Sequence, residues 1–481
     1  MEYKGFINEQ IAAFMCEREN SVAFSLYDGR QVSNISYQEF ARDICAAAGY
    51  FSEQGIRRNH IAIAAPNSYD WIVTFFAIIA SGNIAVPLNQ DLPEDILHWE
   101  CEKADITTIC CDGSFAGTYA NRFPDVKFVL FDDLKKEPSD ADNPLYSTAP
   151  DETIFMLFTS GTTGKSKAVE ITSDNWRYGI QNFEEQYTMN GMECVFTPLP
   201  LYHIVGLLHV VKTLHFNKTV CIGRGLKYTF LDMPALNPTV LNAVPAIVET
   251  LVKMMERVST NRERQKYTGC NLQKISFAGA AMKQSAIRFL QSHGYDVTVI
   301  YGMTEISAAA TWGRIEDEDH ISTVGKFCSC TQHRFQDGEL LLKGPTLMKG
   351  YYNDPKETEK IIENGWIHTG DLGYCDEEGY LYLTGRKKNV IILSNGENVN
   401  PEEIEDKFAQ CPQILECLIF TDGRGICADI YTEDSTAASE FIKNYNQDVP
   451  MYRQVYKVHY SDTPLEKTGS GKIKRKENVY V

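Results

Sequence analysis

The sequence contains no apolar run long enough to cross a membrane and no excess of positive charge. Its longest strongly apolar run, Trp71 to Ala80, falls well short of the roughly 20 residues that a transmembrane helix needs. Lysine and arginine together number 46, against 64 aspartate and glutamate residues, so the formal net charge is -18. A chain this acidic is a poor match for nucleic acid or an anionic membrane surface. We therefore expect no membrane span and no nucleic acid partner.

A secretory leader and a regular cysteine framework are also missing. The opening residues, Met1-Glu-Tyr-Lys-Gly, lack the apolar core of a signal peptide. The 14 cysteines follow no repeating spacing, so we expect reduced thiols and a cytoplasmic protein. Cys328, Cys330 and His333 lie close together in the sequence, but no second pair of ligands follows, and we predict no metal site there.

The sequence contains enough hydrophobic residues to form the core of a large α/β protein. Hydrophobic residues make up 43% of the 481 positions, and the length suits about three domain-sized units. Near the N-terminus, segments typical of buried strands alternate with segments of helical length. The strand-like segments are 61–65, 84–87, 106–110 and 126–131, and the helical ones are 69–81 and 93–104. This alternation predicts parallel βαβ units.

The later parts of the sequence change in character. A further α/β stretch runs over residues 195–301, and short strands alternate with glycine turns over 339–383, which indicates a β subdomain. We predict an α/β fold in which a large N-terminal domain, 1–385, carries this β subdomain. A hinge at 386–388 then leads into a small mobile α+β domain, 389–481.

A loop rich in serine, threonine, glycine and lysine occupies residues 159–167, between two strand-like segments at 154–158 and 168–172. Glycines let the backbone approach a ligand closely, while amides and hydroxyls donate to anionic oxygens. A lysine adds positive charge for a phosphate. The loop therefore predicts a site for a nucleotide triphosphate.

Two other interpretations of this loop stay open. A P-loop NTPase would need glycine where Thr159 stands and a helix directly after the loop, whereas the sequence continues as a strand. A polar surface turn is the simpler alternative, although few turns combine so many hydroxyls, glycines and lysines.

The loop resembles the phosphate loop of the adenylate-forming superfamily, which includes acyl-CoA synthetases, aryl-CoA ligases, luciferases and the adenylation domains of peptide synthetases. Ser166 stands where that family usually has proline, and Ala168 where it has glycine. The resemblance implies that ATP phosphates are bound by Thr159, Ser160, Gly161, Thr162, Thr163, Gly164 and Lys167. It also implies that Thr162 helps to hold a metal ion.

A second motif, Tyr301-Gly-Met-Thr-Glu305, resembles the next signature of the same superfamily. The resemblance implies that Tyr301 stacks on adenine, that Thr304 binds phosphate and that Glu305 holds Mg²⁺, a cation that prefers oxygen ligands. The same resemblance places further residues against the nucleotide: Gly279, Ala280, Ala281, Gly302 and Met303. A strand that ends in a capped helix would give a similar pattern.

Three later segments resemble the remaining motifs of the superfamily in their usual order. Thr369-Gly-Asp371 corresponds to the ribose segment, which implies that Asp371 accepts from the ribose hydroxyls. Gly385-Arg-Lys-Lys-Asn-Val-Ile391 corresponds to the hinge motif, which implies that Arg386 reaches ribose or phosphate and that Lys388 is the pivot. Gly396-Glu-Asn-Val-Asn-Pro401 corresponds to the loop of the thiol channel, with Gly396 and Glu397 lining it.

The last of the motifs is Pro464-Leu-Glu-Lys-Thr-Gly-Ser-Gly-Lys472, whose final lysine serves adenylation in the family. A flexible basic tail is its alternative interpretation. The expected chemistry has two steps. A carboxylate attacks the α-phosphate of ATP, and a thiol then attacks the acyl-adenylate after the small domain turns about Lys388.

The acid is expected to bind near Leu199-Pro-Leu-Tyr-His-Ile-Val-Gly206, with His203 as a catalytic candidate or, alternatively, a core histidine. Relatives that activate amino acids usually place an aspartate there, and this segment has none. We therefore expect a fatty or aryl acid without an α-amine, with ATP and Mg²⁺ as cofactors and coenzyme A as the acceptor. A carrier-protein phosphopantetheine and a non-catalytic nucleotide-binding relative are the alternatives.

This mechanism makes a prediction for two lysines. Lys472→Ala removes one preorganised charge from the adenylation transition state, and pyrophosphate exchange should fall about a hundred- to a thousandfold. Thioester formation from supplied acyl-adenylate should change little. Lys388→Pro should show the reverse, because its fixed φ would hinder the domain turn. Assays of the two half-reactions test this, and equal slowing of both steps by Lys472→Ala would contradict it.

Overall fold

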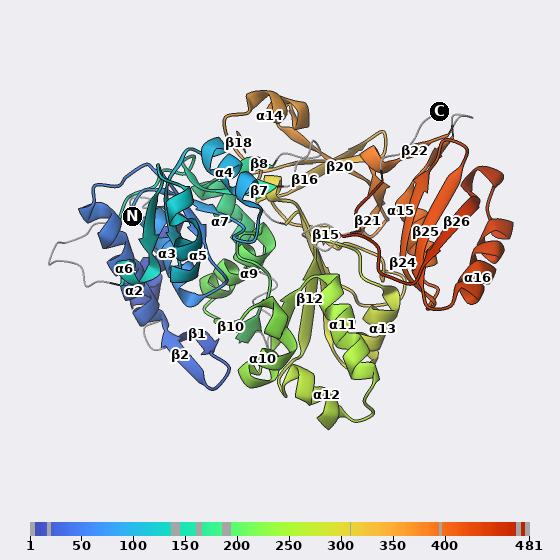
Figure 1. The fold of residues 1–481 in the computed structure, drawn as a ribbon, viewed down its shortest axis with the longest axis horizontal. Coiled ribbons are helices and arrows are strands. Elements are labelled where there is room, and N and C mark those ends of the chain that lie inside the picture. Colours follow the sequence, from blue (N-terminus) through green and yellow to red (C-terminus); the bar gives the residue numbers. More distant parts are fainter. Residues whose placement is uncertain are drawn as a thin grey trace.

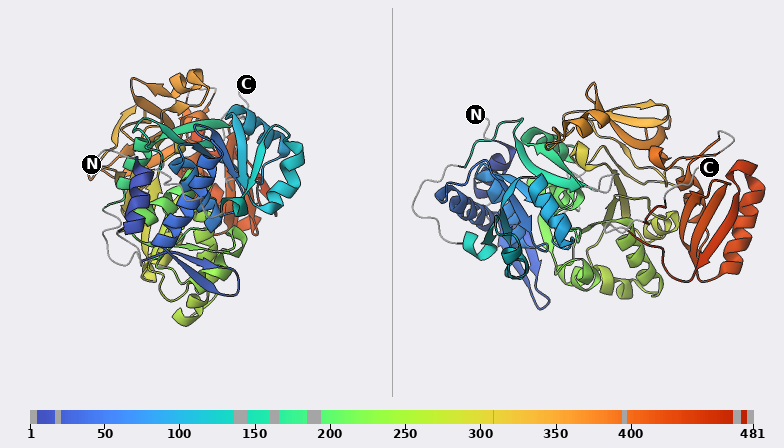
Figure 2. Two further views of the ribbon diagram at one scale, coloured as in Figure 1. Left: turned by 90° about the vertical axis from the view of Figure 1, so that its left-hand side faces the viewer. Right: turned by 45° about the horizontal axis from the view of Figure 1, so that its top comes forward.

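The computed structural model describes residues 5–16, 21–135, 145–159, 166–184, 194–307, 309–393, 397–467 and 473–476. Within these residues the strands form five sheets. Two large sheets with their helices make up most of the molecule, and the last strands and helix form a separate unit at one end (Figures 1 and 2).

The first large sheet has seven strands in the order β18-β8-β7-β4-β3-β5-β6 within the described residues. Its strands are β3 (His60–Ala64), β4 (Ile84–Pro87), β5 (Ile106–Cys111), β6 (Lys127–Leu130), β7 (Thr153–Thr159), β8 (Lys167–Thr172) and β18 (Gly350–Tyr351). Strands β3 to β7 pair in parallel, while β8 and β18 extend the sheet in antiparallel fashion. The predicted parallel βαβ units are therefore confirmed.

The second large sheet has nine strands in the order β15-β14-β13-β12-β11-β9-β10-β1-β2 within the described residues. They are β1 (Val22–Tyr27), β2 (Val32–Ser36), β9 (Cys194–Phe196), β10 (Thr219–Ile222), β11 (Val240–Ala243), β12 (Lys274–Ala278), β13 (Asp296–Tyr301), β14 (Thr311–Arg314) and β15 (Lys326–Phe327). The inner strands are parallel, and antiparallel strands close both edges.

Helices cover both sheets, and several of them share one core with strands of both. Among the described residues, the α-helices that precede residue 300 are α1 (Phe6–Cys16), α2 (Tyr37–Glu53), α3 (Tyr69–Ala80), α4 (Glu94–Lys103), α5 (Gly113–Tyr119), α6 (Phe131–Leu134), α7 (Ser173–Gln181), α9 (Ile204–His215), α10 (Thr229–Leu236), α11 (Pro245–Glu256), α12 (Asn261–Thr268) and α13 (Gln284–Ser292). Helix α3 is buried along nearly its whole length, because it lies inside this shared core. Its apolar run therefore serves packing.

A smaller sheet follows, as the glycine-rich turns of residues 339–383 predict. It consists of β16 (Gln332–Gln336), β17 (Glu339–Lys343), β19 (Ile362–Glu363), β20 (Trp366–Cys375) and β21 (Leu381–Arg386). Helix α14 (Pro355–Ile361) and strand β18 lie between its strands in the sequence, and β18 pairs with β8 of the first large sheet. The chain that links strands of the small sheet is thereby paired with β8, which begins at Lys167.

The C-terminal unit has a core of its own. It comprises β22 (Ile391–Ile392), β23 (Asn398–Val399), α15 (Pro401–Phe408), β24 (Ile414–Thr421), β25 (Ile426–Thr432), α16 (Ser435–Asp448) and β26 (Val455–Ser461). It meets the larger part where α15 packs against β21. Gly385, with φ +155, approaches α15 so closely that a Cβ there would lie 3.0 Å from Glu402 Oε2. The domain boundary and the hinge motion at 386–388 stay predictions.

Two predictions from the sequence concern the redox state of the cysteines and the presence of a membrane span. Cys194 and Cys221 form a disulfide between β9 and β10, so the expectation of reduced thiols is wrong for this pair. Parallel pairing of strands that are distant in sequence brings these two thiols together, while the other cysteines are free. Among the residues that the structure describes, no helix combines the length and apolar character that crossing a membrane requires.

A buried carboxyl in α4 gives a prediction for stability. Burial raises the pKa of Glu100 to about 7, against an opposing hydrogen bond from Ser166. The unfolded chain releases this proton near the ordinary value of 4.5, so folding loses stability as pH rises through the window from 4.5 to about 7. Glu100→Gln removes that cost and should raise the melting temperature above pH 7, but not below pH 4.5.

Melting curves across this pH window test the prediction, with Glu102→Gln on the exposed face of α4 as the matched control. The Glu100 assignment would be wrong if both variants changed the melting temperature equally at every pH.

Candidate active site

Three chain segments meet at a buried aspartate, Asp371. The Tyr301 hydroxyl at the end of β13 donates to Asp371 Oδ2 at 2.6 Å, and Arg386 Nε lies 2.6 Å from Asp371 Oδ1. Asp371 and Arg386 are register partners in β20 and β21. The Thr369 hydroxyl accepts from the Asp371 amide and donates to Leu340 O, which fixes the turn before the aspartate. The residues predicted for adenine and ribose are thus in direct contact.

The protonation state of this group follows from its burial. Asp371 is only 5% exposed, and Tyr301 is half-buried. Burial, and then the negative charge of Asp371, raise the pKa of Tyr301 well above its ordinary value. The phenol therefore stays protonated and remains a donor.

The second predicted motif ends at Glu305, whose carboxylate is held by a tyrosine that the sequence did not single out. Glu305 is 9% exposed and lies in the short turn that follows β13. Its Oε1 accepts from the Tyr351 hydroxyl at 2.8 Å, and its carbonyl accepts from the Met348 amide. Burial and the charge of Glu305 raise the pKa of Tyr351, which keeps it a neutral donor.

Lys167, the last residue of the predicted phosphate loop, contacts the same tyrosine. Lys167 Nζ lies 4.9 Å from the centroid of the Tyr351 ring and 2.5 Å from Glu357 Oε2. The ion pairs of Glu357 with Lys167 and Lys360 lower its pKa to about 2, so this partner is ionised. Tyr351 therefore connects the lysine of the phosphate loop with the carboxylate predicted to hold the metal.

Sequence reasoning missed both Tyr351 and Glu357. The available signal was the run Gly350-Tyr-Tyr-Asn-Asp-Pro-Lys-Glu357, which resembles a turn and a helix start. Nothing local in that run shows that β18 pairs with β8 next to Lys167.

Other predicted residues take up positions around this centre. Thr159 ends β7 and is the register partner of Lys167. The exposed segment Gly279 to Ala281 follows β12, the strand beside β13. Gly302, Met303 and Thr304 continue from β13 to Glu305. Seven predicted residues lie outside the described residues: Ser160, Gly161, Thr162, Thr163, Gly164, Gly396 and Lys472.

His203 directly precedes α9 and is exposed, so its alternative interpretation as a core histidine is wrong. Neighbouring protein atoms that exclude part of its water lower its pKa, which favours a neutral imidazole. The turn that leads to it is held by Asn67, which donates to Leu199 O at 2.7 Å and accepts from the Leu201 amide at 3.0 Å. Sequence reasoning also missed this asparagine.

The ends of the final motif are anchored near the hinge. Lys467 pairs with Ile473, and Arg475 forms ion pairs with Glu402 and Glu405 of α15 at 3.0 and 2.6 Å. The same Glu402 approaches Gly385. This arrangement holds the chain that flanks the predicted Lys472 beside β21.

Lys388 and Glu397 are the other predicted residues on the C-terminal side. Lys388 is exposed, and the atoms around it together with Arg386 and Arg475 lower its pKa. Glu397 closes a turn, because its carbonyl accepts from the Leu393 amide at 2.9 Å. Their roles as pivot and channel residue stay predictions.

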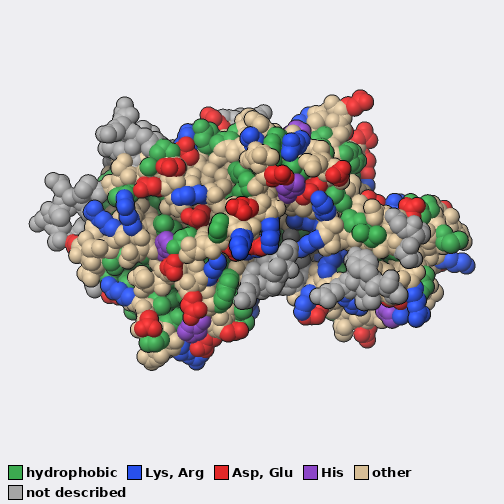
Figure 3. All heavy atoms as spheres, turned by 90° about the horizontal axis from the view of Figure 1, so that it is seen from above, with side chains coloured by type: hydrophobic (Ala, Val, Ile, Leu, Met, Phe, Trp, Pro, Cys, Tyr) green, Lys and Arg blue, Asp and Glu red, His purple; other side chains and the backbone are tan. Residues whose placement is uncertain are grey.

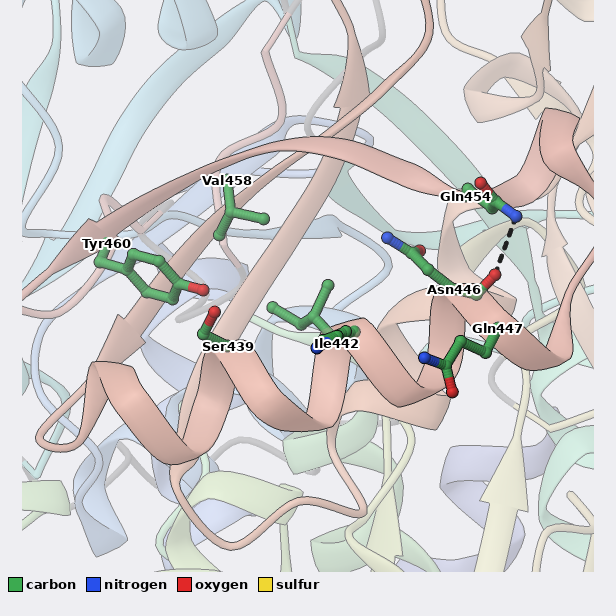
Figure 4. A pocket seen from close by; sticks show the side chains of 8 residues that line it. Ser439, Ile442, Asn446, Gln447, Gln454, Val458 and Tyr460 are labelled. Carbon is green, nitrogen blue, oxygen red and sulfur yellow. Dashed lines mark hydrogen bonds between the residues drawn. The ribbon is translucent and has the colours of Figure 1, made fainter.

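The charge around the site differs from that of the whole chain. Figure 3 shows lysine and arginine side chains gathered around the hollow between the larger part and the C-terminal unit, although the formal net charge is -18. A hollow on α16 and β26, lined by residues such as Ile442, Asn446 and Tyr460, lies in the C-terminal unit and contains none of the predicted nucleotide residues (Figure 4). The basic hollow is the one that suits a triphosphate.

The side chains present are compatible with Mg²⁺ bound together with nucleotide. Among the described residues, no group of three His, Cys, Asp or Glu side chains could hold a metal ion. Mg²⁺ usually takes one or two protein carboxylates and completes its shell with substrate phosphates and water. Glu305, oriented by Tyr351 at the end of β13, supplies such a carboxylate.

Comparison with known proteins agrees with this geometry. The AMP-binding enzyme family model matches residues 13–352, and the model of the AMP-binding enzyme C-terminal domain matches residues 388–480. The chain belongs to the AMP-binding enzyme family. The predicted resemblance to adenylate-forming enzymes is therefore confirmed.

Individual relatives are distant but extend over most of the chain. A 2-succinylbenzoate–CoA ligase of Bacillus cereus (strain Q1) is 24% identical over 460 residues, which cover 92% of this chain and 93% of the relative. The enzyme of the same name from Oceanobacillus iheyensis is 27% identical over 405 residues, 80% of each chain.

Two solved structures show the same fold. The o-succinylbenzoate CoA synthetase of Bacillus subtilis, in complex with its acyl-adenylate intermediate, has a TM-score of 0.83 at 23% identity and covers 98% of this chain and 96% of its own. An anthranilate CoA ligase in complex with anthranoyl-AMP has a TM-score of 0.86 at 16% identity, with the same coverage of 98% and 96%. The predicted α/β fold is confirmed.

The contact between Tyr351 and Glu305 predicts a specific effect on metal use. Tyr351→Phe removes the hydroxyl that orients the carboxylate, and loss of such a supporting hydrogen bond typically costs about tenfold or more in metal affinity. The Mg²⁺ concentration for half-maximal ATP binding, measured by titration, should rise by about that factor. Tyr352→Phe is the matched control, because Tyr352 donates to the distant Asp105. Equal Mg²⁺ dependence of the two variants would contradict the assignment.

Proposed function

We propose that this enzyme uses ATP and Mg²⁺ to convert a carboxylic acid into an acyl-adenylate and then transfers the acyl group to the thiol of coenzyme A. The proposal rests on two groups of side chains that occur together in this member of the AMP-binding enzyme family. Tyr301, Asp371 and Arg386 form the first group, and Lys167, Tyr351 and Glu305 the second.

In the first step a carboxylate oxygen attacks the α-phosphorus of ATP and pyrophosphate leaves. Asp371, held by Tyr301 and Arg386, accepts from the ribose hydroxyls and fixes the nucleotide. Lys167 and the phosphate loop supply positive charge and amide donors to the phosphates. Glu305 would hold Mg²⁺, which would supply neutralisation of the phosphate charge when bound. Lys472 stabilises the charge that develops during the attack.

In the second step the thiolate of the acceptor attacks the acyl carbonyl and AMP leaves with the bonding electrons. The C-terminal domain, 389–481, turns about Lys388 between the steps and exchanges Lys472 for the segment that contains Gly396 and Glu397. The anchoring of Arg475 by Glu402 and Glu405 supports this movement as one body, since it ties the final motif to α15.

The acid lacks an α-amine in this proposal. The segment Leu199 to Gly206 contains no carboxylate that could hold an ammonium group, and His203 at its end is exposed and favoured as neutral. Relatives named for 2-succinylbenzoate and anthranilate favour an aromatic acid and coenzyme A as the acceptor. A carrier-protein phosphopantetheine is the second candidate acceptor, and we place the reaction in the cytoplasm.

Acid-dependent ATP–pyrophosphate exchange tests the proposal. Aryl or fatty acids should stimulate exchange, and Glu305→Gln should reduce it by orders of magnitude, because the neutral amide holds a hard cation poorly. Thioester assays with coenzyme A and with phosphopantetheinyl carrier protein identify the acceptor. Exchange stimulated by amino acids alone would refute the substrate class, and ATP binding without exchange for any acid would favour a non-catalytic nucleotide-binding protein.

A further inference from the structure

A buried glutamate contacts both the turn that carries Asp371 and the hinge motif. Glu339 begins β17 and is only 3% exposed. Its Oε1 accepts from the Gly370 amide at 3.1 Å, and its Oε2 lies 2.7 Å from Lys387 Nζ and 3.2 Å from His368 Nδ1. Glutamate is seldom buried to this extent unless partners compensate its charge. The groups that this carboxylate holds therefore indicate what it does.

The Glu339 carboxylate is ionised, although it is buried. Burial by itself would raise its pKa. Hydrogen bonds from Lys387 and His368, the charge of the lysine and the Gly370 amide outweigh burial and lower this pKa below its ordinary value. Hydrogen bonds to an ionised acceptor are stronger than those between neutral groups. The carboxylate therefore binds the amide and the ammonium group more strongly than a neutral side chain of the same size would.

The turn that Glu339 contacts has a backbone conformation that needs support. Gly370 has φ +71, a region in which residues with a side chain are strained. Among the described residues other than its chain neighbours, none would lie within 4 Å of a Cβ at this position, so the conformation and not crowding calls for glycine. The pairing of β17 with β20 also shifts its register here, between Glu339 and Leu341. Such irregularities re-aim side chains, often beside active sites, and the next residue here is Asp371.

Two consecutive residues of the hinge motif hold this turn at different points. Arg386 Nε lies 2.6 Å from Asp371 Oδ1, and Arg386 Nη1 donates to Thr369 O at 3.3 Å. Lys387 pairs with Glu339, which binds the amide of the residue between Thr369 and Asp371. The ion pair thus adds to the contacts of the arginine, and the lysine acts on the turn through the glutamate.

We propose that Glu339 is a positioning residue for the nucleotide ribose. Its carboxylate couples Lys387 to the turn before Asp371 and keeps that turn in the conformation that directs Asp371 at the ribose hydroxyls. A side chain binds its ligand well only when neighbouring contacts lock its geometry, and Glu339 supplies such a contact. This inference rests on the proposed function, because it takes Asp371 as the ribose ligand.

The discrimination between ATP and 2′,3′-dideoxy-ATP tests the inference. The measured quantity is the ratio of the two Kd values, analogue over ATP, from titration calorimetry with Mg²⁺ and without acid. The wild-type enzyme should favour ATP about a hundredfold, because the analogue leaves the buried Asp371 carboxylate without its two hydroxyl partners. A role of Glu339 in the fold alone would weaken the binding of both nucleotides equally and leave this ratio unchanged.

Two variants should lower the ratio. Glu339→Gln keeps the size of the side chain but removes its charge, and should lower the ratio about tenfold, since the Asp371 carboxylate is no longer held in place. Lys387→Met should lower the ratio by about as much, although this lysine acts only through Glu339. Its side chain is 60% exposed, so its replacement leaves the core intact.

A double-mutant cycle shows whether the two side chains act together. Glu339→Gln combined with Lys387→Met should lower the ratio no further than Glu339→Gln alone, because both changes remove the same ion pair. Lys387→Arg keeps the charge and should retain the wild-type ratio. Lys135→Met is the matched control, because Lys135 is also exposed and pairs with Asp70, outside the site, so its ratio should be unchanged.

The outcomes separate this inference from the proposed function. Thermal melting shows whether each variant is folded, and the Lys387 variants decide the question if Glu339→Gln is not. A wild-type ratio in Lys387→Met, or independent effects of the two substitutions in the double variant, would overturn the inference and leave the proposed function standing. Absence of exchange with any acid would overturn the proposed function, while the ratio of Kd values would still decide whether Glu339 positions Asp371.

Discussion

The buried carboxylate of Asp371 is the constraint on which the site depends. A carboxylate removed from water is costly unless opposite charge and hydrogen bonds compensate it. Arg386 and Tyr301 provide both, one from the neighbouring strand of the same small sheet and the other from the nine-stranded sheet. Because both partners are needed, the two sheets must keep a fixed relative position. The residues predicted for adenine and ribose are held by the same contact that joins these parts of the fold.

The second group of side chains in the site is also held by contacts between separate sheets. Tyr351 lies in a strand that belongs to the first large sheet, although its position in the sequence is next to the small one. Its hydroxyl orients Glu305 and its ring faces Lys167, so the side chains predicted to bind the metal and the phosphates share one support. A site assembled from separate sheets in this way keeps its geometry only when the whole larger part is folded.

The α/β alternation, the positions of the strands β3, β4 and β5, and the family followed from the sequence alone, because these depend on local periodicity and on short motifs in a fixed order. It also named Tyr301, Asp371 and Arg386, which the fold brings into contact. Only the tertiary structure decided that Tyr351 and Glu357 meet Lys167, that Cys194 reaches Cys221, and that His203 is exposed. These facts arise from strand pairings and helix contacts between residues far apart in the chain, and no local pattern encodes which distant partner a residue will meet.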